Sequence, residues 1–324
     1  MRHTSPGFAG RTAGVCALLL LFPGTSVVQA QNASPTIEDE KFRGEIDRIV
    51  TEETVEQGSA ASSEGQRDRR EILRFSDGAV IQQVRIFGTD NVQSYSEFTY
   101  DGEGRVVAWT GYDGENRRLW RYEYEYDSRG HLRQETVFGE SGRVEETTVY
   151  HYEDNRLAEE VSYVGSQVEW RKTYTNAGSG DYREWSLYDG EGVRFKHVEE
   201  RIDQSGNVVR EVHYDQFGGV HEEVVRRYDD YGRLERVEIQ DGAGELIRLE
   251  EHHYDRAGRL LWSRTTLAKS EEPTAEITRY YRDDRGNWTR RVTTVLVGPI
   301  GEQRIARRKV AQRHIRYEDG TVTP

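Results

Sequence analysis

Residues 228–234 read YDDYGRL and residues 254–260 read YDRAGRL, two copies of one pattern that begin 26 residues apart. The pattern also stands at residues 126–132, as YDSRGHL, and at residues 100–106, as YDGEGRV. In each copy an Asp precedes a Gly by three positions. An Asp side chain accepts nearby main-chain N–H groups and Gly readily adopts positive φ, so each copy predicts a tight turn. Recurrence at a fixed period predicts a repeat architecture.

The turns form two interleaved series. The glycines of the first series are Gly78, Gly104, Gly130, Gly206, Gly232 and Gly258, and the second series has Asn116, Gly142, Gln167, Gly192, Gly218 and Gly244 between them. The intervening segments are short and rich in Val, Thr, Tyr and Trp, which is typical of single strands joined as hairpins. They leave no room for crossover helices, so neighbouring strands must be antiparallel. We therefore expect an all-β fold: a repetitive antiparallel β-meander of about 20 strands in one extended, twisted and curled sheet.

The chain divides into four parts. Residues 1–30 are typical of a signal peptide, with a short apolar run after Arg2 and Arg11 and the small-x-small sequence Val28-Gln29-Ala30 before the cleavage point. Residues 31–45 are an expected linker, 46–297 the repeat domain, and 298–324 a basic C-terminal strand or cap with a tail. We expect an exported protein (periplasmic, cell-surface or secreted) with no membrane span after signal removal. Cys16 precedes most of the apolar run, so a lipoprotein anchor is not expected.

Two segments permit more than one secondary structure. Phe42, Ile46, Ile49 and Val50 share a helical face within residues 36–56, although the repeat spacing slightly favours a strand from Ile46. Residues 303–316 are equally ambiguous.

Alternation along the strands predicts one face that carries most tyrosines, together with Trp120, Trp170 and Trp262. Charged residues occur on both faces, so neither predicts a dry sandwich core. We expect the sheet to curl with the tyrosine-bearing face inward.

The YD-x-x-G-R-L pattern resembles the YD repeat of bacterial RHS-type cell-surface proteins. The resemblance covers most of residues 75–290 and is clearest at 126–132, 228–234 and 254–260. It implies a β-shell built from repeats, and for a small exported member it implies an interaction module at the surface or in the periplasm. The repeat carries no catalytic residue.

The sequence favours no enzyme, cofactor or metal site. Paired carboxylates are frequent and are expected to face Arg and Lys across strands. His252 and His253 are adjacent on a strand and point to opposite faces, so they cannot share a metal directly. Acids in the turns suggest calcium, but Asp residues that accept main-chain N–H groups explain them better.

Two sets of residues are candidates for binding. Aromatic side chains that can stack on a ligand are Trp120, Tyr122, Tyr124, Trp170 and Trp262. Cationic residues that can bind an anion are Arg304, Arg307, Arg308 and Lys309; the alternative is a soluble edge strand or one paired with a Glu-rich neighbour. The expected partner is a protein or glycan of the cell envelope. A formal net charge of −13 argues against nucleic acid.

The sequence thus predicts an exported, non-catalytic YD/RHS-like repeat protein that acts as a binding or structural module at the cell envelope. Two alternatives stay open: an outer-membrane β-barrel, which a signal peptide and many strands would fit, and a hydrolase of envelope polymers.

Overall fold

The computed structural model describes residues 44–323 except 58–66, 78, 88–91, 177–180, 269–273 and 299–301. The expected signal peptide (1–30) and most of the expected linker (31–45) lie outside the described residues. Within the described part of the chain, no helix has the length and apolar character needed to cross a membrane.

The described chain is a succession of twenty β-strands. They are β1 (Ile46–Gln57), β2 (Arg67–Ser76), β3 (Ala79–Phe87), β4 (Val92–Tyr100), β5 (Val106–Asp113), β6 (Arg118–Tyr126), β7 (Leu132–Phe138), β8 (Val144–Glu153), β9 (Arg156–Val164), β10 (Gln167–Asn176), β11 (Tyr182–Asp189), β12 (Arg194–Ile202), β13 (Val208–Tyr214), β14 (Val220–Tyr228), β15 (Leu234–Asp241), β16 (Leu246–Tyr254), β17 (Leu260–Leu267), β18 (Thr274–Arg282), β19 (Trp288–Val297) and β20 (Arg304–Tyr317). Both ambiguous segments are strands over most of their described length: β1 begins at Ile46, and β20 begins at Arg304.

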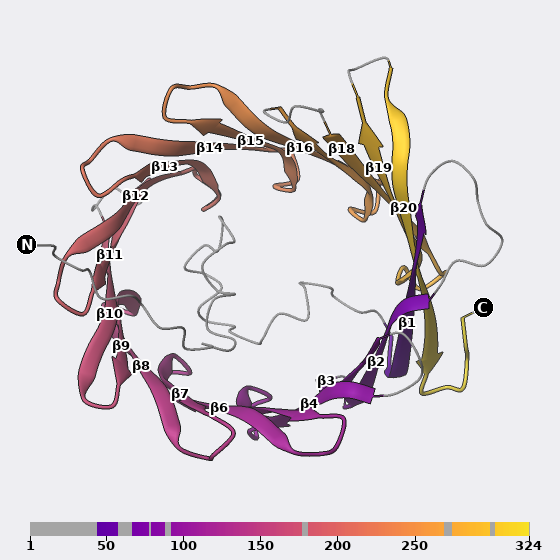
Figure 1. The fold of residues 1–324 in the computed structure, drawn as a ribbon, viewed down its shortest axis with the longest axis horizontal. Helices are drawn as coiled ribbons and strands as arrows, with labels where there is room; N and C mark the ends of the chain where they lie inside the picture. Colours follow the sequence, from indigo (N-terminus) through magenta and orange to yellow (C-terminus); the bar gives the residue numbers. More distant parts are fainter. Residues whose placement is uncertain are drawn as a thin grey trace, which may run out of the picture.

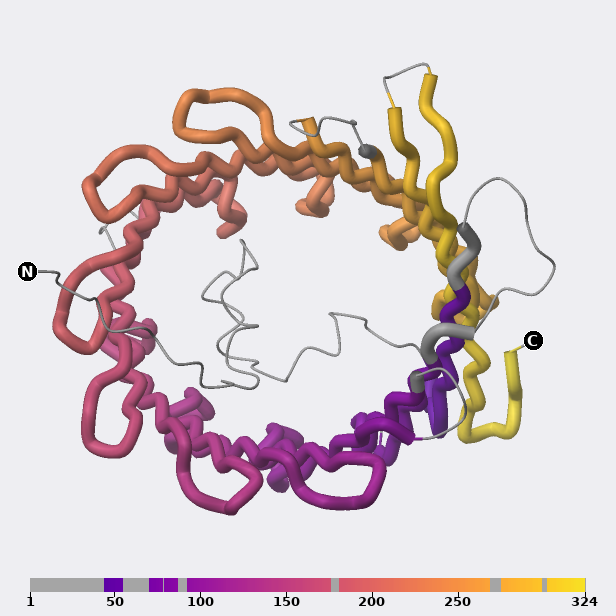
Figure 2. Tube along the Cα trace, viewed as in Figure 1, coloured from indigo at the N-terminus to yellow at the C-terminus, as the bar shows by residue number. Residues whose placement is uncertain are grey.

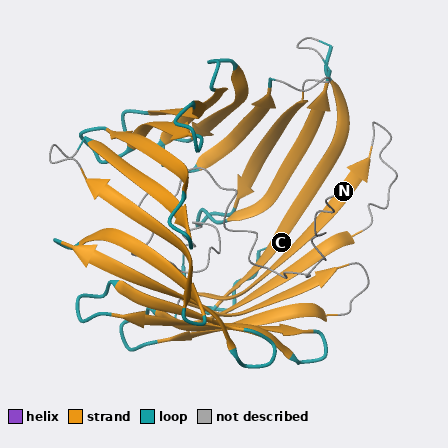
Figure 3. Cartoon of the chain, turned by 60° about the vertical axis from the view of Figure 1, so that its left-hand side comes forward, coloured by secondary structure: helices purple, strands orange, loops and turns teal. Residues whose placement is uncertain are grey.

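The sheet closes on itself. Each strand pairs antiparallel with its neighbours in sequence, and β20 also pairs with β1, from Ile46 opposite Tyr317 to Gln57 opposite Arg307. The expected all-β meander of about 20 strands is confirmed, and it forms a closed barrel (Figures 1 and 3). Hairpins at one rim extend outward, as β19–β20 does, and turns at the other rim curl toward the axis (Figure 2). Closure leaves none of the twenty described strands with an unpaired edge, which removes the usual route to edge-to-edge aggregation.

The Asp-x-x-Gly turns have the geometry that their sequence predicts. In the turn after β4, Oδ1 of Asp101 accepts the main-chain N–H groups of Glu103 and Arg105, each at 2.9 Å, and Oδ2 accepts the Nε–H of Arg105 at 2.7 Å. These bonds, led by the main-chain N–H of Arg105, lower the pKa of Asp101. Gly104 closes the turn at φ 78°.

Tyrosine hydroxyls at four of the turns link one repeat to the preceding one. The hydroxyl of Tyr126 donates to the main-chain carbonyl of Val106, twenty residues earlier, at 2.8 Å. Tyr100, Tyr228 and Tyr254 make the equivalent bonds to Val80, Val208 and Leu234 at 2.7, 3.1 and 2.8 Å. The turn arginine adds a second link, because the guanidinium of Arg105 lies over the ring of Tyr126, 4.7 Å from its centroid. The YD-x-x-G-R sequence is therefore a structural connection between successive hairpins.

A register shift opens each strand that follows a first-series turn, and it corrects the face assignment. In the β16–β17 pair Tyr254 faces Leu260, but His253 faces Trp262, so one extra residue lies between Leu260 and Trp262. Such a bulge moves the residues beyond it to the other face. Trp262 therefore lies on the face opposite the tyrosines, and its expected place among them was wrong.

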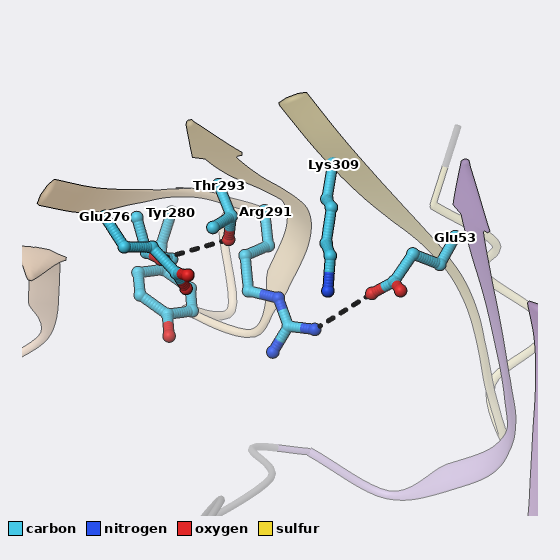
Figure 4. Close-up of a pocket in the computed structure, with 7 residues that line it drawn as sticks. Glu53, Glu276, Tyr280, Arg291, Thr293 and Lys309 are labelled. Carbon is cyan, nitrogen blue, oxygen red and sulfur yellow. Dashed lines mark hydrogen bonds and ion pairs between the residues drawn. The ribbon is translucent and has the colours of Figure 1, made fainter. Parts of the chain in front are cut away.

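The face that carries Tyr100, Tyr126, Tyr228 and Tyr254, here called the tyrosine face, is the concave face of the barrel. Figure 4 shows side chains of this face on the inner side of the curved sheet from β18 to β1. Near the rim that the first-series turns form, this face carries an apolar cluster that runs from β20 across β1 to β7. Its members include Ile49, Leu73, Phe98, Leu132 and Ile315.

Candidate ligand-binding surface on the concave face

Aromatic rings pack against one another on the tyrosine face of β5 and β6. The ring centroids of Trp109 and Trp120 are 4.6 Å apart, and those of Tyr122 and Tyr124 are 6.4 Å apart in a stacked arrangement. Gly111 makes room for the indole: a Cβ there would lie 2.2 Å from Cε2 of Trp120. Three predicted ligand-stacking residues thus lie together. Tyr124 is buried in the apolar cluster, whereas Trp120 and Tyr122 are half-buried, so of these three residues Trp120 and Tyr122 are the ones that a ligand can reach.

Carboxyl groups lie beside these rings on β7, β8 and β9. Burial, and next the charges of Glu146 and Glu160, raise the pKa of Glu135 to about 7. Ser162 donates a hydrogen bond to Glu146, and Tyr174 donates one to Glu160. The result is a group of three acids. Glu135 has a pKa near neutral pH, and Glu146 and Glu160 each accept a hydrogen bond from a hydroxyl group.

Cations complete this part of the concave face on β10 to β12. The Nζ atom of Lys172 lies 4.7 Å from the ring centroid of Tyr174 and 4.4 Å from that of Trp185, and Lys196 lies 5.2 Å from Trp185. Burial lowers the pKa of Lys172. On the same face, the buried Arg183 of β11 and Glu200 of β12 form an ion pair. On the next two strands of the barrel, Glu211 of β13 and Arg226 of β14 form another. Buried charges need such partners to offset their lost hydration.

A polar pocket lies where the barrel closes. Its volume is about 170 Å³, and it is lined by Glu53, Glu276, Thr278, Tyr280, Arg291, Thr293 and Lys309 from β1, β18, β19 and β20. Figure 4 shows the Lys309 ammonium beside the guanidinium of Arg291, which pairs with Glu53 at 3.5 Å. Thr278 and Thr293 share a hydroxyl hydrogen bond at 3.0 Å. The pocket offers two cations and several hydroxyl groups to a polar ligand.

The remaining predicted residues are dispersed. Trp170 faces Ser162 and Asp189 on the tyrosine face of β10, whereas Trp262 stacks on His253 on the convex face, with ring centroids 5.0 Å apart. Arg307 and Lys309 belong to the concave face and Arg308 to the convex face, because neighbours on a strand alternate. The four predicted anion-binding residues therefore do not form one patch, because Arg308 faces away from Arg307 and Lys309. Their strand, β20, has β19 and β1 on its two sides and is not an edge.

Sequence reasoning missed Trp109, Glu135 and Arg291. Trp109 and Glu135 follow a bulge, so simple alternation from the turn assigns them to the wrong face. Arg291 lines the pocket beside Glu53 only because β1 pairs with β20, and this pairing could not be read from the sequence. Applying the bulge to every strand after an Asp-x-x-Gly turn would have recovered the first two.

No protein-family model matches the chain, and no curated protein sequence matches it. Among solved structures, a porin-like protein from Bacteroides uniformis matches with a TM-score of 0.36 and 14% identity, over 83% of this chain and 97% of that one. A TcdB2-TccC3-TEV structure matches with a TM-score of 0.27 and 12% identity, over 82% of this chain and 18% of that one. At these values the function has to be argued from the residues of this chain.

Proposed function

We propose that the chain is a non-catalytic YD/RHS-like β-barrel of the cell envelope that binds a polyhydroxylated partner, a glycan, on its concave face. The observation that carries this proposal is that the half-buried Trp120 and Tyr122 share the concave face with the hydrogen-bonding acids and hydroxyl groups of β7 to β10. Sugars are bound by aromatic faces that cover their C–H surfaces and by polar groups that reach their hydroxyls. Both kinds of group meet on one concave surface here.

The acids of this surface fit binding better than hydrolysis. A glycosidase needs a protonated carboxyl group and an ionised one that both face the scissile bond. Glu135 has the raised pKa that a general acid needs, but it is packed against the sheet near Tyr124 and Tyr150. Its neighbours Glu146 and Glu160 already accept hydrogen bonds from Ser162 and Tyr174.

A second candidate is an outer-membrane barrel, and closure of the sheet through β1 and β20 favours it in architecture over an open sheet. The convex face opposes membrane insertion, because it carries charged pairs in the middle of its strands. Arg121 pairs with Glu123, Arg210 with Glu223 and Arg236 with Glu238, each at 2.7 Å. A charged side chain against lipid costs about 2–4 kcal/mol near the bilayer midplane.

Fractionation separates these two candidates. We expect the full-length protein expressed in a Gram-negative host to be released with the periplasm or the medium and to stay in solution without detergent. Recovery only from detergent-solubilised outer membranes would overturn the soluble barrel and support the membrane barrel.

Glycan binding is tested with two tryptophan variants. Immobilised cell-envelope polysaccharides are the probe, and Trp120→Ala is compared with Trp262→Ala, whose ring lies on the convex face. We expect Trp120→Ala to weaken binding about tenfold, because the loss of one stacking ring removes roughly 1.4 kcal/mol of binding free energy. Trp262→Ala should bind like wild type. Trp120→Phe, which keeps a ring at this position, controls for folding. Equal binding by all variants, or no binding by wild type, would contradict the proposal.

A further inference from the structure

Three potential metal ligands meet on the convex face, away from the surface described above. Glu184 of β11 and His197 and Glu199 of β12 each offer a ligand atom, and these atoms all lie within 4.8 Å of one another. The register explains the meeting: Glu184 faces Glu199 directly, and Ser186 faces His197. Three side chains on two paired strands are held in place by the main-chain ladder.

The two glutamates have weaker support from cations than other glutamates of this face: Arg210, which pairs directly with Glu223, attracts Glu199 only over a longer distance. Like charges directly opposite each other on paired strands are unfavourable. Elsewhere on this face glutamates pair with arginine, as Glu223 does with Arg210. Among the described residues, no Lys or Arg forms an ion pair with Glu184 or Glu199. Their outer neighbours across the strands are Thr175 and Val212. A bound divalent cation would remove this repulsion.

Neighbouring polar groups hold the three side chains in a ligating arrangement. The Oγ of Ser186 lies 3.0 Å from Nδ1 of His197, which leaves Nε2 on the side of Glu199, 3.8 Å from its Oε1. Tyr182 donates to Oε2 of Glu184 at 3.3 Å, and Tyr214 forms a hydrogen bond with Glu199. Outer-shell bonds of this kind orient metal-bound imidazole and carboxylate groups.

We propose that Glu184, His197 and Glu199 bind one divalent transition-metal ion, and that zinc is the ion they fit best. One imidazole nitrogen and two carboxylate oxygens are a ligand set that zinc accepts, and calcium would require six to eight oxygens. Three protein ligands leave a coordination position open. The side chains of His197 and Glu199 are 17% and 35% exposed, so water or an anionic group of a partner can reach that position.

The test uses cobalt(II) as a spectroscopic probe on the full chain without a histidine tag. We expect one Co²⁺ per chain, with visible absorption that Zn²⁺ displaces. His197→Ala and Glu199→Gln should each weaken binding about tenfold or more. A matched control is His252→Ala. Nε2 of His252 also lies close to the carboxylate of a glutamate two residues away, 3.7 Å from Oε2 of Glu250, but this glutamate already pairs with Arg248. This control should bind cobalt like wild type.

Three outcomes would overturn the proposal: no binding by wild type, more than one weak equivalent, or equal binding by His197→Ala and wild type. Thermal unfolding supplies a readout independent of the spectrum. Zn²⁺ should raise the unfolding temperature of wild type and of His252→Ala, but not that of Glu199→Gln, because a ligand that binds only the folded chain stabilises it. Failure of this test leaves the proposed glycan surface unaffected, since the two sites lie on opposite faces.

Discussion

The guanidinium of Arg282 donates to the main-chain carbonyl of Leu260 at 3.0 Å, and so makes the bond that Tyr254 makes to Leu234 one repeat earlier. Arg282 occupies the tyrosine position of its turn, immediately before Asp283. It also donates to the carbonyl of Gly286 at 3.0 Å. Where this link between repeats is made, it needs a long side chain whose end donates a hydrogen bond, and the aromatic ring is one way to supply it.

Replacement of Arg282 tests this requirement. We expect Arg282→Ala to lower the free energy of unfolding by about 2 kcal/mol, because two main-chain carbonyls lose a charged donor. Arg282→Tyr should recover about half of that loss by restoring the bond to Leu260. Urea unfolding followed by tryptophan fluorescence measures both. Equal loss in the two variants would show that the position needs the charge and that a donor alone does not suffice.

The tyrosine hydroxyls offer a sharper comparison. The hydroxyl of Tyr254 donates to Leu234 at 2.8 Å, whereas the buried hydroxyl of Tyr152 has no hydrogen-bond partner and its ring stacks on His131 instead. Tyr254→Phe should therefore cost about 1 kcal/mol in unfolding free energy, and Tyr152→Phe should cost nothing or stabilise the fold slightly. Equilibrium unfolding in urea checks both variants, and a larger loss for Tyr152→Phe would refute this account.

The repeat spacing predicted the strands and their order because turn chemistry is local. Asp101 and Gly104 fix their turn through bonds within five residues, and such signals can be read directly from the sequence. Closure could not be read in this way, since it depends on the pairing of β1 with β20, whose residues lie more than 200 positions apart. Strand twist predicts curling, but whether the ends meet depends on strand number and stagger together.

The candidate surface was predicted in part for a related reason. Trp120, Tyr122 and Tyr124 lie on β6, which ends at a tyrosine, so alternation counted back from Tyr126 is correct. Trp262 lies on β17, which begins after a turn with a bulge, and there the same count fails. The cluster of Glu184, His197 and Glu199 combines two strands through a register that the sequence alone does not specify.

Two glycines of one turn differ in backbone conformation but not in the space around them. Gly104 has φ 78° and Gly102 has no positive φ, and a Cβ at either position would meet nothing within 4 Å. Gly104→Ala should therefore lower the unfolding free energy by about 1–2 kcal/mol, because an L-residue is strained in the left-handed region. Gly102→Ala should be neutral or stabilise by up to about 1 kcal/mol through the unfolded chain. Thermal unfolding of both variants measures the difference, and equal effects would refute it.

Glu135 makes stability depend on pH in the direction opposite to a paired carboxylate. Its pKa is raised from 4.5 to about 7, first by burial and then by Glu146 and Glu160, so between these values the folded chain holds a proton that the unfolded chain has released. Stability is therefore lost as pH rises from about 4.5 to 7 and changes no further above that range. A shift of this size corresponds to about 3 kcal/mol.

Glu135→Gln should remove this loss, because the amide stays neutral at every pH. We expect the variant and wild type to have similar unfolding free energies near pH 4.5, and the variant to be more stable by up to about 3 kcal/mol at pH 8. Urea unfolding at intervals of half a pH unit measures the difference. Glu125→Gln is the control, since Glu125 is exposed on the convex face of β6. If the Glu135→Gln and wild-type curves run parallel from pH 4.5 to 8, the proton is not held at Glu135.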